Sequence, residues 1–261
     1  MTASFFNYPS PNHNARPPSQ AINMLVLHYT GLPSTQSALA RLCDRQSKVS
    51  AHYLIDEGGG IFVLVDEARR AWHAGVAYWA GENDINACSI GIELAHKGHN
   101  ADGTCDPFPQ AQMEACADLA SQLLARYNIP PQRILGHSDV APARKIDPGE
   151  AFDWAWLAAR DIGLWPQQKQ IKDKMDDIKQ NAIKQNRADK VLCVDDKGEQ
   201  VRQLQTDLAD FGYGTRIDGF YGADTKAVIC AFQRHFRPQQ IDGCADRETR
   251  ACLQVVRQLC Q

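Results

Sequence analysis

The sequence predicts an α/β protein with a mixed central β-sheet flanked by helices, followed by a small all-α domain of three helices. Short apolar segments that are typical of buried strands alternate with amphipathic helical segments over most of the chain. Beyond residue 190 only helical periodicity continues. The length of 261 residues also fits one larger and one smaller domain, since domains average roughly 150 residues.

Changes in composition divide the chain into four parts: an N-terminal arm at 1–21, an α/β domain at 22–166, a linker at 167–190 and a helical domain at 191–261. The arm is rich in Pro, Asn and Ser and lacks periodicity, so it is expected to be an ordered or loose segment before the first strand. The linker has no Gly, Pro or aromatic residue, and Ile171, Met175 and Ile178 follow one another at helical spacing. This pattern favours a helical linker over a flexible tether.

Hydrophobic periodicity predicts the elements of the α/β domain. Met24 to Tyr29 is a short apolar run that indicates a buried strand, and a later amphipathic stripe stops at Pro130 and Pro131, which end a long helix. Three consecutive glycines indicate the turn of a hairpin. In chain order we expect a strand at 24–29, a helix at 35–44, hairpin strands at 52–55 and 61–65, a strand at 89–94, a helix at 109–127, a strand at 133–137 and a helix at 153–162.

The helical domain contains an internal repeat of the form I-D-G-x5-T-x-A, which begins at Ile217 and again at Ile241. Each copy predicts a tight glycine turn followed by a helix. Apolar residues line one face of the segments 201–211 and 228–236, so these helices and the one after the second copy can bury one small core. A purely structural repeat and a functional one both fit these residues.

The balance of charges limits the classes of partner. The chain has 28 Lys and Arg against 31 Asp and Glu, a net charge of -3, and therefore lacks the excess of cations that binding to a nucleic-acid backbone requires. The longest apolar runs are far shorter than the roughly 20 residues of a membrane-spanning helix, so no transmembrane segment is expected. Because no secretory leader is visible, we expect a cytoplasmic protein, with the periplasm or cell envelope as the alternative.

Nine cysteines are present, none of them in a C-x-x-C pair. Five lie in the helical domain: Cys193, Cys230, Cys244, Cys252 and Cys260. Several of them fall at core-like helix positions, which favours buried free thiols over disulfides, although the spacing leaves the disulfide state open.

Three side chains are candidates for a metal site. His28 and His137 each end an apolar strand, and Asp147 follows ten residues after His137, so that one loop can return it to the same place. Two histidines and a carboxylate suit Zn²⁺, and three protein ligands leave a fourth position open for catalysis. Each residue alone has an ordinary structural interpretation, but the combination predicts a catalytic zinc site.

The motifs around these residues resemble a known family. The chain contains, in this order, L-H-Y-T at 27–30, G-I-E-L at 91–94, G-H-S-D at 136–139 and K-x-D-P-G at 145–149. This series resembles the motifs of the zinc N-acetylmuramoyl-L-alanine amidases of the AmpD-like kind. The resemblance covers about residues 24–165. Separately, the segments from residue 201 onward resemble the small three-helix peptidoglycan-binding domain that accompanies many cell-wall hydrolases.

This resemblance implies roles for individual residues. The implied zinc ligands are His28, His137 and Asp147. Glu93 is expected to activate the attacking water, and Lys145 to stabilise the oxyanion, as suits a carboxylate and a cation in such positions. The residues expected to line the substrate cleft are His52, Tyr53, Trp72 and His73. For the two histidines of that set, a structural role next to the metal ligands is an equally good interpretation.

The function that follows is hydrolysis of the amide between the lactyl group of N-acetylmuramic acid and L-alanine, with peptidoglycan or muropeptides as the substrate. Two alternatives are a non-catalytic peptidoglycan recognition protein of the same fold and a zinc peptidase that cuts the stem peptide, which the fold alone does not separate. The helical domain either holds the enzyme on polymeric wall material or buries apolar surface of the α/β domain. The oligomeric state is left open.

Overall fold

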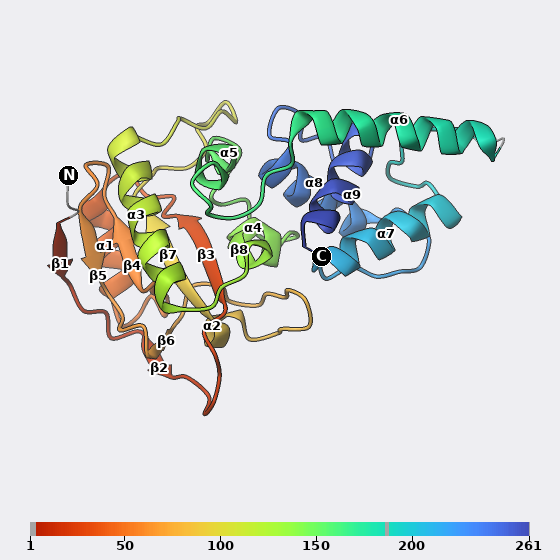
Figure 1. Ribbon diagram of the computed structural model, residues 1–261. Helices are drawn as coiled ribbons and strands as arrows, with labels where there is room; N and C mark the ends of the chain where they lie inside the picture. The colour runs from red at the N-terminus through yellow and green to blue at the C-terminus, as the bar shows by residue number, and fades with distance from the viewer. Residues whose placement is uncertain (1–3, 186–187, 261) are drawn as a thin grey trace.

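The computed structural model describes residues 4–185 and 188–260. Figure 1 shows a sheet covered by helices in the N-terminal part of the chain and a group of helices, coloured green to blue, in the C-terminal part. This arrangement confirms the predicted fold class, a mixed α/β domain followed by a small all-α domain. Among the described residues, no helix has the length and apolar character needed to cross a membrane.

The central sheet is mixed, as expected. Its strands lie in the order β1 (Phe5–Asn7), β5 (Ile61–Val63), β4 (Tyr53–Ile55), β7 (Ser89–Leu94), β3 (Met24–Tyr29) and β8 (Ile134–Gly136). β3 runs parallel to both β7 and β8, and β4 runs parallel to β7, whereas β5 is antiparallel to β4. A separate antiparallel pair joins β2 (His13–Ala15) to β6 (Arg69–Ala71).

Alternation along β3 divides its side chains between two cores. Leu25 and Leu27 point to the core beneath the long helix α3 (Gln110–Arg126). Met24 and Val26 point to the opposite face of the sheet, where they join a core that includes residues of the C-terminal helices. By the same alternation, His28 lies on the face of Met24 and Val26, near the carboxyl end of the strand.

The other helices of the α/β domain are short: α1 (Thr35–Cys43), α2 (Ile85–Cys88), a 3-10 helix (Pro131–Arg133), α4 (His137–Val140) and α5 (Trp154–Ala158). α5 covers only part of the helix expected at 153–162, because the chain turns at Asp161 and Gly163, which have φ angles of 60° and 87°. The strand expected at 133–137 ends at Gly136, so His137 is the first residue of a helical turn.

The N-terminal arm is ordered over its described residues and adds two strands that its composition does not predict. β1 extends the sheet edge beside β5, where Phe6 stacks on Phe62 with ring centroids 5.1 Å apart. The Arg16 guanidinium donates to the backbone carbonyls of Glu67, Asn86, Ala87 and Ser89. Such short segments take their conformation from tertiary partners, so local periodicity does not reveal them.

The C-terminal part contains α6 (Gln168–Lys184), α7 (Glu199–Phe211), α8 (Ala223–Phe236) and α9 (Arg247–Leu259). α6 occupies most of the segment expected as a linker and lies along α9 (Figure 1). Its apolar stripe, formed by Ile171, Met175 and Ile178, packs into the core of the helical domain. The linker helix is therefore held by burial of this stripe.

The two domains share one hydrophobic core. Val26 and Leu135 of the sheet belong to the same cluster of buried residues as Leu208 of α7 and Phe232 of α8. Removing the helices would expose this apolar surface to water, which costs roughly 25 cal/mol per Å². The structure thus favours a helical domain that completes the α/β domain, beside any role in holding substrate.

The internal repeat has a structural explanation. The amide oxygen of Gln205 accepts the backbone N–H of Gly219 at 2.8 Å, and the amide oxygen of Gln233 accepts the backbone N–H of Gly243 at 2.8 Å. Each glutamine also donates from its amide nitrogen to the aspartate and the threonine of its own copy of the motif. In both copies, a buried glutamine from the preceding helix fixes the glycine turn.

One of the C-terminal cysteine pairs forms a disulfide. Cys193 and Cys244, 51 residues apart, are bonded to each other with their Cα atoms 4.7 Å apart. The preference for buried free thiols is therefore wrong for this pair. Cys230, Cys252 and Cys260 are free, but of these three only Cys252 is buried. Spacing alone did not identify the bonded pair, because the Ile241 turn is what brings Cys244 beside the segment before α7.

Candidate active site

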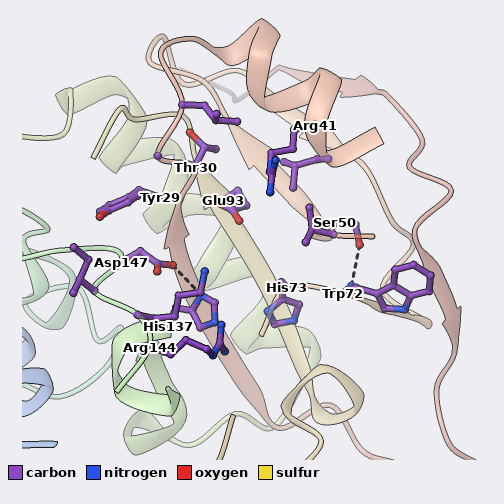
Figure 2. A pocket seen from close by; sticks show the side chains of 16 residues that line it. Tyr29, Thr30, Arg41, Ser50, Trp72, His73, Glu93, His137, Arg144 and Asp147 are labelled. Atoms are coloured by element: carbon purple, nitrogen blue, oxygen red, sulfur yellow. Dashed lines mark hydrogen bonds and ion pairs between the residues drawn. The ribbon is translucent and has the colours of Figure 1, made fainter. Parts of the chain in front are cut away.

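A pocket with a volume of about 360 Å³ opens at the carboxyl ends of β3, β7 and β8 (Figure 2). This end of parallel strands is where α/β proteins commonly bind ligands. The lining comes from the strand ends, α1 and neighbouring loops: Tyr29, Thr30, Gly31, Leu32, Arg41, Leu42, Val49, Ser50, Trp72, His73, Glu93, His137, Arg144, Lys145, Ile146 and Asp147.

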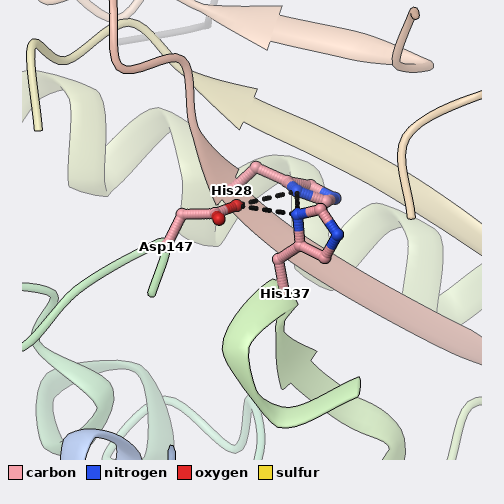
Figure 3. A group of neighbouring side chains, drawn as sticks. All are labelled: His28, His137 and Asp147. Carbon is pink, nitrogen blue, oxygen red and sulfur yellow. Dashed lines mark hydrogen bonds and ion pairs between the residues drawn. The ribbon is translucent and has the colours of Figure 1, made fainter. Parts of the chain in front are cut away.

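The three predicted metal ligands meet at this pocket (Figure 3). His28 Nδ1, His137 Nδ1 and Asp147 Oδ2 form a triangle in which each pair of atoms is 3.0 Å apart. All three side chains are buried. In a tetrahedral zinc site, ligand atoms about 2.0–2.1 Å from the ion are about 3.3–3.4 Å from one another. The triangle is therefore close to the size that a zinc ion requires.

The hydrogen bonds on the far sides of the rings determine which nitrogen of each neutral histidine carries the proton. His137 Nε2 faces the carbonyl of Ala74 at 2.9 Å, so it must donate. The Ser89 hydroxyl donates to the Ile85 carbonyl at 2.5 Å, and its oxygen accepts from His73 Nε2 at 3.1 Å. His73 Nδ1 is then an acceptor for His28 Nε2, at 3.1 Å.

Both Nδ1 atoms of the triangle consequently carry lone pairs. Burial, together with the positive charge that His137 would carry, lowers the pKa of His28 to about 4, and burial also holds the pKa of His73 well below its usual range. Two unprotonated nitrogens and a carboxylate oxygen at 3.0 Å repel one another unless a cation lies between them. The donor set and its orientation thus fit a metal ion with imidazole and carboxylate ligands.

The strand register places Glu93 beside this triangle. His28 of β3 and Glu93 of β7 are paired in parallel register, so their side chains leave the same face of the sheet. Two residues earlier on β7, Gly91 leaves room for a ring, because a Cβ there would lie 2.5 Å from Cγ of His73. The glycine is therefore required for His73 to reach Nε2 of His28.

Glu93 has the environment of a general base. Its Oε2 atom is buried and, among the described residues, has no hydrogen-bond partner. Burial raises the pKa of Glu93 to about 8, the negative charge of Asp147 adds to the rise, and the positive charge of Lys145 opposes it. A carboxyl group with a pKa near neutrality can both accept and return a proton. Lys145, partly exposed, lines the same pocket.

The residues expected in the cleft separate into two pairs. Trp72 and His73 line the pocket, and Trp72 donates from Nε1 to Asn14 Oδ1 at 2.7 Å. His52 and Tyr53 instead lie behind its wall, which corrects their expected placement. His52 accepts the Gly91 N–H at 2.9 Å, and the Tyr53 hydroxyl donates to Glu67. Neighbouring residues of an extended segment point to opposite sides, so His52 and Tyr53 cannot both reach the pocket. His52 is also enclosed by the ordered N-terminal arm.

Sequence reasoning missed two residues that support the ligands. Arg144 Nη2 donates to the carbonyls of Ala74 and Val76, at 2.7 and 2.8 Å, and so holds the loop whose Ala74 carbonyl also accepts from His137. Arg144 could have been identified as a candidate because it is next to Lys145 in the sequence. Ser89 begins a predicted strand, and nothing in its local sequence marks it as a partner of His73.

Comparisons with known proteins agree with these motifs. The family model described as N-acetylmuramoyl-L-alanine amidase matches residues 18–150, and a peptidoglycan binding domain model matches residues 197–253. The N-acetylmuramoyl-L-alanine amidase AmiD of Escherichia coli is 37% identical over 245 residues, 90% of this chain and 82% of that protein. The 1,6-anhydro-N-acetylmuramyl-L-alanine amidase AmpD of Haemophilus influenzae is 38% identical over 163 residues, 56% of this chain and 85% of that protein.

Solved structures extend the similarity to both domains. AmiD of Escherichia coli, in complex with anhydro-N-acetylmuramic acid-L-Ala-D-gamma-Glu-L-Lys, has a TM-score of 0.77 at 35% identity, over 94% of this chain and 92% of that one. AmpDh3 of Pseudomonas aeruginosa, in complex with an anhydromuramic pentapeptide, has a TM-score of 0.78 at 30% identity, over 94% and 95%. With a family model matching residues 18–150 and a relative 37% identical over 82% of its length, the chain belongs to the N-acetylmuramoyl-L-alanine amidase family.

Proposed function

We propose that this amidase is zinc-dependent and cleaves the amide between the lactyl group of N-acetylmuramic acid and L-alanine, in peptidoglycan or muropeptides. The observation that carries the proposal is the triangle of His28 Nδ1, His137 Nδ1 and Asp147 Oδ2 in the same pocket as Glu93. Two imidazoles and one carboxylate are a donor set that zinc uses in catalytic sites, where a further position stays open.

The protein residues have distinct parts in the reaction. His28, His137 and Asp147 would hold the ion, which when bound supplies a Lewis acid that polarises the amide carbonyl and activates water. Glu93 accepts a proton from the attacking water and delivers it to the amine of L-alanine as the C–N bond breaks. Lys145 stabilises the negative charge that develops on the carbonyl oxygen. The products are the free lactyl carboxylate and a peptide with a free amino terminus.

The supporting contacts preserve the state of the ligands. His73 and the Ala74 carbonyl each accept an Nε2–H from a ligand histidine, which keeps both Nδ1 atoms unprotonated and both rings in one orientation. Arg144 holds the Ala74 carbonyl in place. These residues act on the ligands and do not contact the reacting bond.

Muropeptides with an anhydromuramic group belong to the proposed substrates. The solved structures of AmiD and AmpDh3 contain anhydromuramyl peptides, and both proteins match this chain over its two domains. Trp72 gives one wall of the pocket an aromatic face, and Arg41 gives it a cation for a substrate carboxylate. The C-terminal domain, which matches a peptidoglycan binding family, would increase the local concentration of the enzyme on polymeric wall material.

We propose the periplasm or cell envelope as the location, in place of the cytoplasm expected from the sequence. The Cys193–Cys244 disulfide supports it, since structural disulfides persist in oxidising compartments and are rare in the cytosol. Fractionation of cells, with immediate alkylation of free thiols, would test this location. We expect the protein in the envelope fraction with these two cysteines protected; cytosolic protein with both of them alkylated would contradict it.

Mass spectrometry of reaction products tests the proposed bond. Incubation with purified sacculi and with a soluble anhydromuramyl tripeptide should release free peptides that begin with L-alanine and leave unsubstituted muramic acid. A zinc peptidase would shorten the stem peptide and leave L-alanine on the sugar. A recognition protein would release no product while still sedimenting with sacculi.

A further inference from the structure

The contact between the two domains includes a buried carboxylate next to the metal site. Asp139 lies in α4 and is 1% exposed. Its Oδ1 accepts the hydroxyl proton of Tyr213 at 2.7 Å, and its Oδ2 accepts Nδ1–H of His235 at 2.7 Å. Tyr213 follows α7 and His235 lies on α8, so both donors come from the C-terminal domain. Two residues from outside the α/β domain therefore hold one of its side chains.

Asp139 in turn holds the helical turn that carries a metal ligand. Its Oδ2 also accepts the backbone N–H of Gly136 at 2.8 Å, which closes the turn from Gly136 to Asp139 around His137. The backbone N–H of Ser138, inside this turn, donates to the carbonyl of Asp147 at 2.9 Å. One turn thus carries His137 directly and is tied by a hydrogen bond to the backbone of Asp147.

The two donors are themselves fixed by ring packing. The His235 ring stacks on Trp154 of α5, with centroids 3.8 Å apart, and on Phe236, with centroids 4.0 Å apart. The Tyr213 ring packs edge-on against Trp79, with centroids 4.9 Å apart. Gly212 permits this approach, because a Cβ at that position would lie 2.6 Å from the Trp79 ring. Neither donor can leave Asp139 without disturbing a buried aromatic contact.

We infer that Tyr213 and His235 are positioning residues of the catalytic site, which through Asp139 hold His137 and Asp147 in the geometry that binds the metal. The inference rests on the proposed zinc amidase function. It assigns the C-terminal domain a part in the metal centre in addition to binding polymer. The site in this chain is accordingly completed by residues far from it in sequence.

The expected mechanism of this effect is loss of order in the turn. Without the Tyr213 hydroxyl, Oδ1 of Asp139 loses its donor in a place where water has no access. The carboxylate, with one oxygen left unpaired, is then free to rotate, and its bond to the Gly136 N–H weakens. Since supporting hydrogen bonds of metal ligands are worth about 10- to 100-fold in metal affinity, and this one acts through the turn, we expect about a tenfold effect.

The test is Tyr213→Phe in the full chain, with Tyr221→Phe as the matched control. Tyr221 is also buried in the C-terminal domain, and its hydroxyl donates to the Gly243 carbonyl at 2.9 Å, away from the α/β domain. Each variant removes one buried hydroxyl and leaves the ring in place. The measurements are zinc affinity by competition with a chromophoric chelator, kcat and KM on a soluble muropeptide, and sedimentation with sacculi.

Tyr213→Phe should weaken zinc binding about tenfold and lower kcat by a similar factor, with unchanged KM and sacculus binding, while Tyr221→Phe leaves zinc affinity within about twofold. Equal zinc affinities of the two variants would overturn the inference. If Tyr213→Phe does not fold, two variants of His235 replace it. His235→Asn keeps a donor near the Nδ1 position and should bind zinc more tightly than His235→Leu. Equal zinc affinities of these two variants would also overturn the inference. A wild-type protein that binds zinc but cleaves no muropeptide would overturn the proposed function alone.

Discussion

Asp139 and Asp147 are buried carboxylates in adjacent segments of the chain, and they have opposite kinds of neighbours. Asp139 accepts hydrogen bonds from the Gly136 N–H, the Tyr213 hydroxyl and His235 Nδ1. Asp147 Oδ2 lies 3.0 Å from the Nδ1 atoms of two histidines, and the bonds on the far sides of those rings leave both nitrogens unprotonated.

The difference shows what distinguishes a structural carboxylate from a proposed metal ligand in this protein. Burial is common to both, and each lies beside a histidine nitrogen. The contact on the far side of each histidine ring decides which nitrogen carries the proton. His137 Nε2 faces the Ala74 carbonyl and must donate there. His235 Nε2 has no partner among the described residues, so Nδ1 of that ring can carry the proton. Asp139 is satisfied by protein donors, whereas the surroundings of Asp147 fit a cation.

The largest effect is expected at Asp147. Asp147→Asn should abolish stoichiometric zinc binding and reduce amide cleavage to the background rate, because it removes a charged ligand and the activation that the ion supplies. A chelator should do the same to the wild type, and added Zn²⁺ should restore activity. The measurements are metal content by atomic absorption and turnover of a soluble muropeptide. Asp102→Asn, at an exposed position, is the matched control. Full activity of the metal-free wild type would contradict the assignment of the triangle as a metal site.

Glu93→Gln should have the next largest effect. It preserves side-chain size but removes the base, so turnover should fall about 10²- to 10⁴-fold, the usual contribution of general acid–base catalysis. Zinc content should stay stoichiometric, since Glu93 is not a corner of the triangle. The combination of full zinc content and low kcat separates this variant from Asp147→Asn. Unchanged turnover would leave Glu93 with a structural role only.

Asp139→Asn should have a smaller effect on activity and a clear one on stability. The substitution removes the charge and leaves only one acceptor oxygen for three donors. Breaking a buried charged hydrogen bond costs about 2–4 kcal/mol in the free energy of unfolding. Turnover should fall about 10- to 100-fold, with zinc still bound at saturating concentration. Urea denaturation and zinc titration measure the two effects. A variant that lost zinc as completely as Asp147→Asn would erase the difference between the two carboxylates.

That the three proposed metal ligands lie together could be predicted from sequence, because local rules place two of them. His28 ends an apolar strand, His137 follows another, and parallel strands bring their carboxyl ends to the same edge of the sheet. Their motifs also carry the family resemblance. For the same reason the sequence predicted most strands and helices that have strong periodicity, such as β3 and α3.

The support of the site could not be predicted in this way. Tyr213 and His235 lie on helices whose own pattern explains them as core positions, and their contact with Asp139 depends on how two domains pack. Arg16 belongs to an arm without periodicity, yet its guanidinium and the Gly91 N–H enclose His52 behind the pocket. Such contacts join residues far apart in the chain, and local propensity carries no information about them.

The smallest predicted effect is on the stability of the metal-free protein, and it comes from Glu93. Its Oε2 has no partner among the described residues, and burial raises its pKa to about 8, above the ordinary value of about 4.5. Between these two values the folded protein holds a proton that the unfolded chain has released. The contribution of Glu93 to the stability of the metal-free protein therefore falls as the pH rises through this range, and this loss is complete above about pH 8.

Glu93→Gln removes this titration, so the metal-free variant should become more stable than the metal-free wild type as the pH rises from about 5 to about 8.5. A shift of one pKa unit corresponds to about 1.4 kcal/mol, and partial exposure of the side chain to water reduces it, which gives an expected difference of about 1–3 kcal/mol. Urea denaturation at several pH values, with the exposed Glu114→Gln as control, measures it. Parallel stability curves for wild type and Glu93→Gln would show that the carboxyl group is as well solvated as an ordinary surface glutamate. A widening gap would mean that the protein keeps its general base at the expense of stability, as active sites commonly do.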